Sequence, residues 1–190
     1  MAGRRLVFVE ETSMREFSGF AEEQGWSSEE VSIDLDGDID EDRPMLRWEA
    51  ASGSVCFIDD SIIRCQYVQV ESVADEEQIR ASFVCFDREE AVRSLDLGAG
   101  QGAVRRGFRL IACTAVGAFD DAVFATTIRG LGDDRPHVRK SALIVPQYTS
   151  WSEFLPEIIR LDEGDPDLDV RETAGGIRML LELAAQLADG

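Results

Sequence analysis

The fold of this chain is decided by a stretch that occurs twice: GDDRPHVRKSA at residues 132–142 and GDPDLDVRETA at residues 164–174. Gly, Asp, Val, Arg and Ala recur in place at a constant offset of 32 residues. A repeat of this period is typical of helical hairpins that stack on one another, because one hairpin cannot bury its apolar face alone. The repeat therefore predicts a helical stack in the C-terminal part of the chain.

Each recurring residue has a physical role in such a stack. The Asp after the glycine, Asp133 or Asp165, can accept backbone N–H bonds at the start of the next helix. The Val begins the apolar face, and the Ala four residues later is small enough for close helix packing. The Arg, Arg139 or Arg171, can donate a forked hydrogen bond to the capping Asp of a neighbouring repeat. We therefore expect these arginines to tie successive repeats together.

The pattern Asp-x4-Val-Arg-x2-Ala, with an apolar helix after each copy, resembles HEAT-type repeats. The resemblance spans residues 118–188 and includes the segment around Trp151 and Phe154 between the two copies. It implies a stack of helical hairpins that acts as a scaffold or a binder. Small bacterial HEAT-repeat proteins include immunity or regulatory partners of other proteins, and a few larger members bind damaged DNA.

Five helices are expected in this half, and their boundaries follow capping and proline signals. Pro146 is expected to end the third helix, and Ser150 with Glu153 forms a capping box before the fourth. In the last helix, Leu180 and Leu187 are expected to face the core with their apolar neighbours. The expected helices cover residues 103–116, 120–131, 137–145, 152–161 and 169–188.

Residues 1–97 do not match the repeat and are expected to form a small α/β unit with antiparallel hairpins. Short turns separate three of its four expected strands, which cover residues 5–10, 45–50, 54–59 and 62–71. Ser13 and Glu16 form a capping box that opens a helix with Phe17 and Phe20 on one face. The small residues 97–102 predict a linker. We therefore expect an α+β fold with two domains, residues 1–97 and 98–190.

The chain is strongly acidic, with a formal net charge of −19 over 190 residues. The charge is uneven, being −15 over residues 1–100 and −4 over residues 101–190. Such a surface repels nucleic acid and anionic lipid and speeds association with basic proteins. Plain solubility is the alternative explanation of the charge. The sequence favours a basic protein partner and argues against a nucleic-acid or membrane partner.

The densest acidic run supplies the candidate partner-binding residues: Asp34, Asp36, Asp38, Asp40, Glu41 and Asp42. A calcium loop is the competing interpretation. The run departs from the EF-hand pattern, because Gly37 comes fourth rather than sixth and Met45 stands where the bidentate Glu belongs. We therefore expect a solvated acidic loop on the binding face rather than a metal site.

Few residues could carry catalysis. His137 is the only histidine, and it lies at the expected start of a helix, where exposure is the common outcome. The four cysteines are scattered through apolar segments, which is typical of reduced core thiols in a cytoplasmic protein. One basic cluster, Arg105, Arg106 and Arg109, is too small for a nucleic-acid surface. We expect no cofactor and no metal.

The sequence thus favours a non-catalytic, cytoplasmic protein-binding module. Its sharpest form is an acidic immunity protein that neutralises a basic toxin. A scaffold or regulatory adaptor is the alternative within the same class. An enzyme that processes nucleic acid on a HEAT-type scaffold is the alternative from another class, and it would need a broad basic surface.

Overall fold

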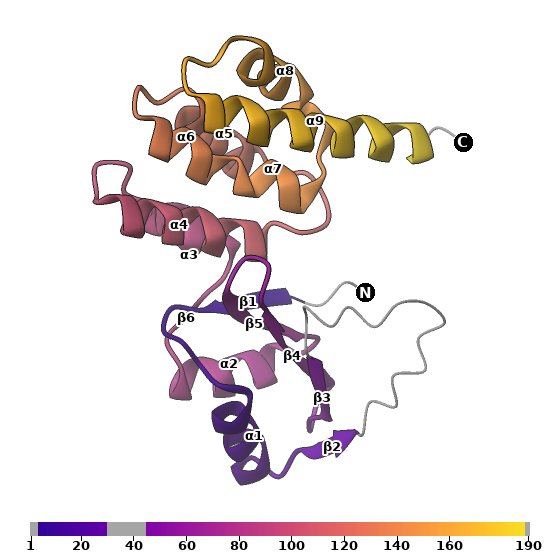
Figure 1. Cartoon of the computed structure of the whole chain (residues 1–190). Helices are drawn as coiled ribbons and strands as arrows, with labels where there is room; N and C mark the ends of the chain where they lie inside the picture. Colours follow the sequence, from indigo (N-terminus) through magenta and orange to yellow (C-terminus); the bar gives the residue numbers. More distant parts are fainter. Residues whose placement is uncertain (1–3, 30–44, 189–190) are drawn as a thin grey trace. The chain divides into compact units, whose positions relative to one another are not determined.

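A computed structural model describes residues 4–29 and 45–188 of the chain. Backbone contacts divide the chain into two compact units, Met1–Asp87 and Arg88–Gly190. The first unit is a sheet with helices and the second is helical, which confirms the expected α+β class (Figure 1). The division precedes the glycine-rich segment at residues 97–102, because helix α3 (Arg88–Ser94) packs on helix α4 (Gln101–Thr114) across it.

Unit 1 is built on one antiparallel sheet with the strand order β2-β3-β4-β5-β1-β6. The first strand thus lies between the fifth and the sixth, and the chain forms consecutive hairpins from β2 to β5 (Figure 1). The strands are β1 (Arg4–Phe8), β2 (Ser27–Glu29), β3 (Met45–Glu49), β4 (Ser54–Asp60), β5 (Cys65–Val70) and β6 (Cys85–Phe86).

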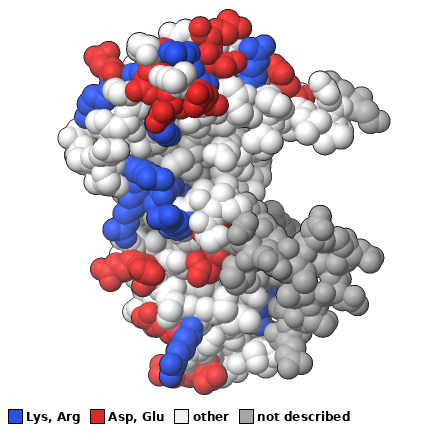
Figure 2. All heavy atoms as spheres, viewed as in Figure 1, with Lys and Arg blue, Asp and Glu red and all other residues white. Residues whose placement is uncertain are grey.

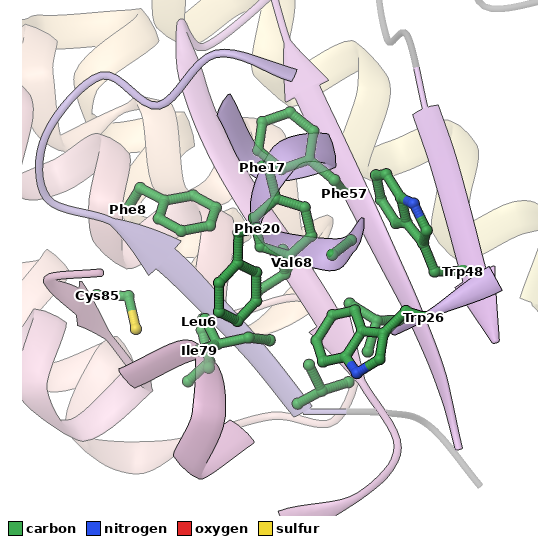
Figure 3. Close-up of a cluster of buried hydrophobic side chains, with 13 residues drawn as sticks. Leu6, Phe8, Phe17, Phe20, Trp26, Trp48, Phe57, Val68, Ile79 and Cys85 are labelled. Atoms are coloured by element: carbon green, nitrogen blue, oxygen red, sulfur yellow. The ribbon is translucent and has the colours of Figure 1, made fainter. Parts of the chain in front are cut away.

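An aromatic core forms where helices α1 (Met14–Glu23) and α2 (Val73–Ser82) supply side chains to one face of this sheet. Phe17 lies at its centre, with ring centroids 5.2 Å from Phe57 and 5.3 Å from Trp48 (Figure 3). The predicted cap of α1 is confirmed, because the backbone N–H of Glu16 donates to the hydroxyl of Ser13 over 3.1 Å. The core and the cap together fix α1 against the sheet.

The turn before β5 corrects one expected boundary. The strand begins at Cys65 and not at residue 62, because Asp60 accepts hydrogen bonds from the backbone N–H groups of Ile62 and Ile63. Arg64 then takes a left-handed conformation with φ of 54°. A short polar side chain that bonds the backbone two residues on is a turn signal, and here it outweighs the β-branched residues.

Asp75 is an unusual feature of unit 1, because it is 1% exposed and neither carboxylate oxygen has a hydrogen-bond partner among the described residues. Burial raises the pKa of this carboxyl above its ordinary value. The ionised form is therefore penalised in the folded chain. Asp75 lies in the first turn of α2, where the helix dipole offsets part of this cost.

Replacing Asp75 with alanine is expected to raise the free energy of unfolding by roughly 1 kcal/mol at neutral pH, near the low end of the cost of an unsatisfied buried group. The raised pKa sets the sign of the pH dependence. The penalty is present above the folded pKa and absent below the unfolded one, so the gain shrinks on acidification. Urea unfolding across pH, with the exposed Glu77→Ala as the control, measures this; a pH-independent difference would contradict it.

Unit 2 is a stack of helical hairpins. Helix α3 packs on α4, α5 on α6, and α8 on α9, while α4 lies against α6 and α7, and both of these lie against α9 (Figure 1). In this article, α4, α6, α7 and α9 are the inner layer. Besides α3 and α4, the helical elements are α5 (Asp121–Leu131), α6 (Pro136–Ala142), α7 (Ile144–Thr149), the 3-10 helix η1 (Ser152–Phe154), α8 (Leu155–Gly164) and α9 (Leu168–Ala188).

Close packing between these helices depends on Gly130 in α5. A Cβ added there would lie 2.4 Å from the ring of Phe108 and 2.8 Å from the Cβ of Ala142. The glycine thus lets α5 approach both α4 and α6. The Ala of the repeat, four residues after its Val, has the small size that this approach requires, as the repeat predicts.

Two expected helix boundaries in unit 2 are wrong. Pro146 does not end a helix: α6 ends at Ala142, and Pro146 lies in the first turn of α7, where its missing N–H removes no helical bond. Ser150 is not the N-cap of the next helix, because it has a φ of 54° and is the C-cap of α7. The expected burial of Trp151 and Phe154 is confirmed.

The outward side of α9 also differs from expectation. Ile177 and Leu181 are buried as predicted, but Leu180 and Leu187 are exposed. The buried face of α9 is therefore narrower than the sequence predicts. One packed layer, α8 with α6 and α7, covers only part of the circumference of this helix.

Candidate binding groove

The inner layer of unit 2 begins each main helix with the same pair of residues, Val and Arg. Val138 and Val170 belong to the two evident copies of the repeat, and Val104 in α4 precedes Arg105 in the same way. All three valines are fully buried. Helix α4 is therefore a degenerate third copy, which keeps only the Gly, Val and Arg. Sequence reasoning missed it because Ala99 and Phe108 stand where the later copies have Asp and Ala.

The predicted tie between repeats is confirmed at Arg139. Its Nε and Nη2 donate to the two carboxylate oxygens of Asp165, both over 2.7 Å, and its Nη1 donates to the backbone carbonyls of Asp133 and Asp134. Both side chains are buried. Burial alone would raise the pKa of Asp165, but the hydrogen bonds from Arg139 and the Asp167 backbone hold it below its ordinary value.

The same arginine of the last copy behaves differently. Arg171 donates to the backbone carbonyl of Asp165 in its own repeat and reaches no further carboxylate among the described residues. The arginine of one repeat bonds the Asp of the following repeat. No repeat follows the last copy among the described residues, so its arginine bonds only the turn of its own repeat. The expectation that Arg171 forks onto a capping Asp is therefore wrong, and the position that does so is Arg139.

At the other end of the stack, the first arginine is left without its partner. Asp133, the residue that Arg105 would reach by analogy, is bound instead by Arg135 over 2.8 and 2.9 Å. The hydrogen bonds from Arg135 lower the pKa of Asp133 to about 2. Arg105 is exposed, and it forms no hydrogen bond or ion pair within residues 4–29 and 45–188. Its guanidinium is thus available to a ligand.

Arg105 lines a groove that crosses the inner layer, over the first turns of α4 and α9 and along α6 to the start of α7. The groove has a volume of about 540 Å³, and its walls come from all three copies of the repeat. Basic side chains gather over α4 in the view of Figure 2. The lining residues are Gln101, Arg105, Pro136, His137, Lys140, Ser141, Ile144, Asp167, Asp169 and Thr173.

Equivalent positions of the repeat line the groove in α6 and α9. The hydroxyl of Ser141 donates to the carbonyl of His137, and the hydroxyl of Thr173 donates to the carbonyl of Asp169, each over 2.7 Å. These hydroxyl protons are therefore bound within their helices. The groups that remain to meet a ligand are the charged and imidazole side chains together with Gln101.

One ion pair spans the groove. Lys140 Nζ in α6 lies 2.8 Å from a carboxylate oxygen of Asp169 in α9, and both side chains are exposed. The hydrogen bond from Lys140 lowers the pKa of Asp169. An exposed pair of this kind adds little to stability because water and salt screen it. Lys140 and Asp169 can therefore separate to meet a partner at a small cost in free energy. The groove thus offers charges of both signs.

The acidic residues expected to bind a partner, Asp34 through Asp42, lie outside the described residues. The three clustered arginines take separate positions: Arg105 lines the groove, Arg106 is exposed but does not line it, and Arg109 is half-buried. The four cysteines form no disulfide. Within the described part of the chain, no group of His, Cys, Asp and Glu side chains is arranged to hold a metal ion.

The described helices include none with the length and hydropathy needed to cross a membrane. The groove is an open surface lined by both polar and apolar groups of α4, α6, α7 and α9 together with Asp167. Comparison of the chain with protein-family models, curated proteins and solved structures finds no match.

Proposed function

We propose that this chain is a non-catalytic protein-binding module whose groove holds a segment of a basic protein. The single observation that carries the proposal is the groove itself: three copies of the repeat converge on it with side chains that the fold does not use. Arg105 forms no bond within the described residues, and the Lys140–Asp169 pair is exposed. Residues that are not needed for packing but share one surface are typical of a binding site.

The charge of the chain supports a basic partner. A net charge of −19 creates a field that attracts a basic protein and speeds its approach. Asp167 and Asp169 place acidic groups on the groove beside the basic Arg105 and Lys140, and opening of the exposed Lys140–Asp169 pair leaves a carboxylate for a basic segment. An acidic immunity protein that neutralises a basic toxin is the sharpest form of this proposal, and a cytoplasmic scaffold or adaptor is its broader form.

The groove is tested by two charge reversals on α9. The partner is recovered from the native cell with the chain as bait, and binding is measured by surface plasmon resonance. Asp169→Lys and Glu172→Lys change the net charge equally, but only Asp169 lines the groove. We expect Asp169→Lys to raise the dissociation rate by about tenfold, equivalent to about 1.4 kcal/mol. Glu172→Lys should lower only the association rate.

The acidic run at residues 34–42 is tested in the same assay. Changing Asp36, Asp38, Asp40 and Asp42 together to Asn should slow association more than it speeds dissociation, and added salt should reduce the effect. Equal effects of the two α9 reversals on dissociation would exclude the groove. An acidic partner, or an association rate indifferent to salt and to the four Asn substitutions, would exclude the electrostatic mechanism.

A further inference from the structure

We propose that the segment held in the groove carries an acidic side chain that binds Arg105 and a basic side chain that binds the acidic residues at the start of α9. The partner is thus recognised by an acid and a base on one short segment rather than by a run of basic residues. This inference rests on the proposed function, because it concerns the same groove, and it adds the chemistry of the segment that fits there.

Arg105 is the arginine of the first copy of the repeat, and the partner that it lacks is a carboxylate. In the next copy, Arg139 donates to both carboxylate oxygens of Asp165 over 2.7 Å. The carboxylate that Arg105 would reach by analogy belongs to Asp133, which already accepts from the backbone N–H, the Nε and the Nη2 of Arg135. The guanidinium of Arg105 therefore keeps the forked geometry that binds a carboxylate but finds no carboxylate among the described residues.

Helix α4 itself supplies no acid to Arg105. The helix contains no Asp or Glu from Gln101 to Thr114, so no acidic side chain lies one turn away on the same helix. Gln101 lies one turn before Arg105 and also lines the groove, with a side-chain amide that can donate to a ligand oxygen. Two donor groups of α4 therefore line this end of the groove, and one acidic side chain can accept from both.

The other end of the groove has the opposite charge. Helix α6 contacts both α4 and α9, so the start of α9 lies across α6 from Arg105. Asp167 and Asp169 line the groove there. One oxygen of Asp167 accepts from the N–H of Val170, and Asp169 forms its exposed pair with Lys140. Both carboxylates can therefore accept from a basic side chain, Asp167 through its second oxygen and Asp169 when the exposed pair opens.

The charges that line the groove favour a segment that carries both signs. The lining contains two basic residues, Arg105 and Lys140, and two acidic residues, Asp167 and Asp169. With His137 neutral, their formal charges sum to zero. A purely basic segment would place a cation beside Arg105, and a purely acidic one would place an anion beside the two aspartates. An acid and a base in the matching order meet an opposite charge at both ends.

A phosphate group fits this lining less well than a carboxylate. A phosphorylated side chain brings about two negative charges at neutral pH, into a groove that already holds two carboxylates. A carboxylate brings one negative charge and matches the planar fork of Arg105. The lining therefore favours Asp or Glu over a phosphorylated residue or a nucleic-acid backbone, in keeping with the net charge of −19.

Synthetic peptides that differ only in two side chains test the proposal with the full chain. The peptides have a Gly-Ser backbone with blocked ends and carry Glu and Lys, Lys and Lys, Glu and Glu, or phosphoserine and Lys, in both orders and at several spacings. Binding is followed through the chemical shifts of backbone amides in NMR titrations. We expect a Glu–Lys peptide to shift the amides at the starts of α4 and α9 and to bind about tenfold more tightly than the other three kinds.

Two charge reversals on α4 locate the contact with the acid. Arg105→Glu and Arg106→Glu change the net charge equally at neighbouring exposed positions, but only Arg105 lines the groove. Arg105→Glu should weaken binding of the Glu–Lys peptide about tenfold and make a Lys–Lys peptide the tightest ligand. Arg106→Glu should leave the order of the peptides unchanged. Arg105→Gln removes the charge without reversing it, and it should abolish the preference for Glu–Lys over Lys–Lys.

The outcomes that overturn the proposal are specific. They are a wild-type chain that binds another kind of peptide as tightly as every Glu–Lys peptide, groove amides that no peptide shifts, and equal effects of Arg105→Glu and Arg106→Glu. Failure of the proposed function is distinguishable, because the comparison of Asp169→Lys with Glu172→Lys on the recovered partner does not involve Arg105. A groove confirmed by that comparison but indifferent to Arg105→Glu would keep the proposed function and remove the acidic side chain from the segment.

Discussion

Replacing Arg139 with alanine is expected to lower the free energy of unfolding of unit 2 by about 3–5 kcal/mol, the usual loss when one member of a buried ion pair is removed. Arg139 holds both oxygens of Asp165 and two backbone carbonyls of its own turn. Without the arginine, Asp165 stays buried with only the N–H of Asp167 as a donor among the described residues. Urea unfolding of the full chain, with hydrogen exchange in α6 and α9, measures the loss.

Lys140→Ala is the matched control for this prediction. Lys140 is the next residue in α6 and pairs with Asp169 of α9, but this pair is exposed, whereas the Arg139–Asp165 pair is buried. We expect a loss of at most about 1 kcal/mol, as for surface ion pairs in general. Equal losses for Arg139→Ala and Lys140→Ala would contradict the tie between repeats.

The pH dependence of the Arg139 effect follows from Asp165. Its pKa is lowered in the folded chain, so its contribution to stability is present above the unfolded pKa and is lost as pH falls through the folded one. Arg139→Ala removes the main cause of the lowered pKa. The difference between the wild-type chain and the variant should therefore shrink on acidification. A difference that grows below the unfolded pKa would contradict this assignment.

The repeat allowed the inner layer of unit 2 to be predicted because its recurring residues act locally. The buried valines and an arginine that joins two repeats follow from the properties of single positions. The expected helix caps are wrong, because Asp133 and Asp165 accept from the N–H groups of Arg135 and Asp167 in the turns before α6 and α9. Which of the three arginines joins two repeats depends on the neighbours that each one meets in the stack. Arg171 has no following repeat, and Arg105 loses Asp133 to Arg135. Competition of this kind, between two arginines for one carboxylate, depends on the three-dimensional arrangement of the helices and cannot be predicted from single positions.

The features that the sequence did not predict share another cause. β2 and β6 have three and two residues, too few for an alternating pattern to register. Pro146 predicts the end of a helix, but a proline fits equally well in the first turn of a new one, where the structure places it. The groove gathers Gln101, His137 and Thr173 from different helices, and no spacing along the chain marks them as neighbours.

Replacing Phe154 with alanine is expected to lower the free energy of unfolding by about 3–5 kcal/mol, because a large cavity would remain in a packed core. Phe154 is fully buried. Its ring centroid lies 5.1 Å from that of Phe124 and 6.0 Å from that of Trp151, with which it is stacked. It thus joins the segment before α8 to α5. A loss of this size approaches the whole stability of a small domain.

Phe119→Ala provides the comparison within the same aromatic cluster. Phe119 contacts Phe124 and Trp151, with ring centroids 5.4 and 5.1 Å away, but 40% of it is exposed. Its removal opens a surface that water can fill, so the loss should be well below that of Phe154→Ala. Hydrogen exchange should also show that Phe154→Ala deprotects the amides of α5 and α8. Losses of equal size for the two variants, or unchanged protection in α5, would mean that Phe154 does not join these helices.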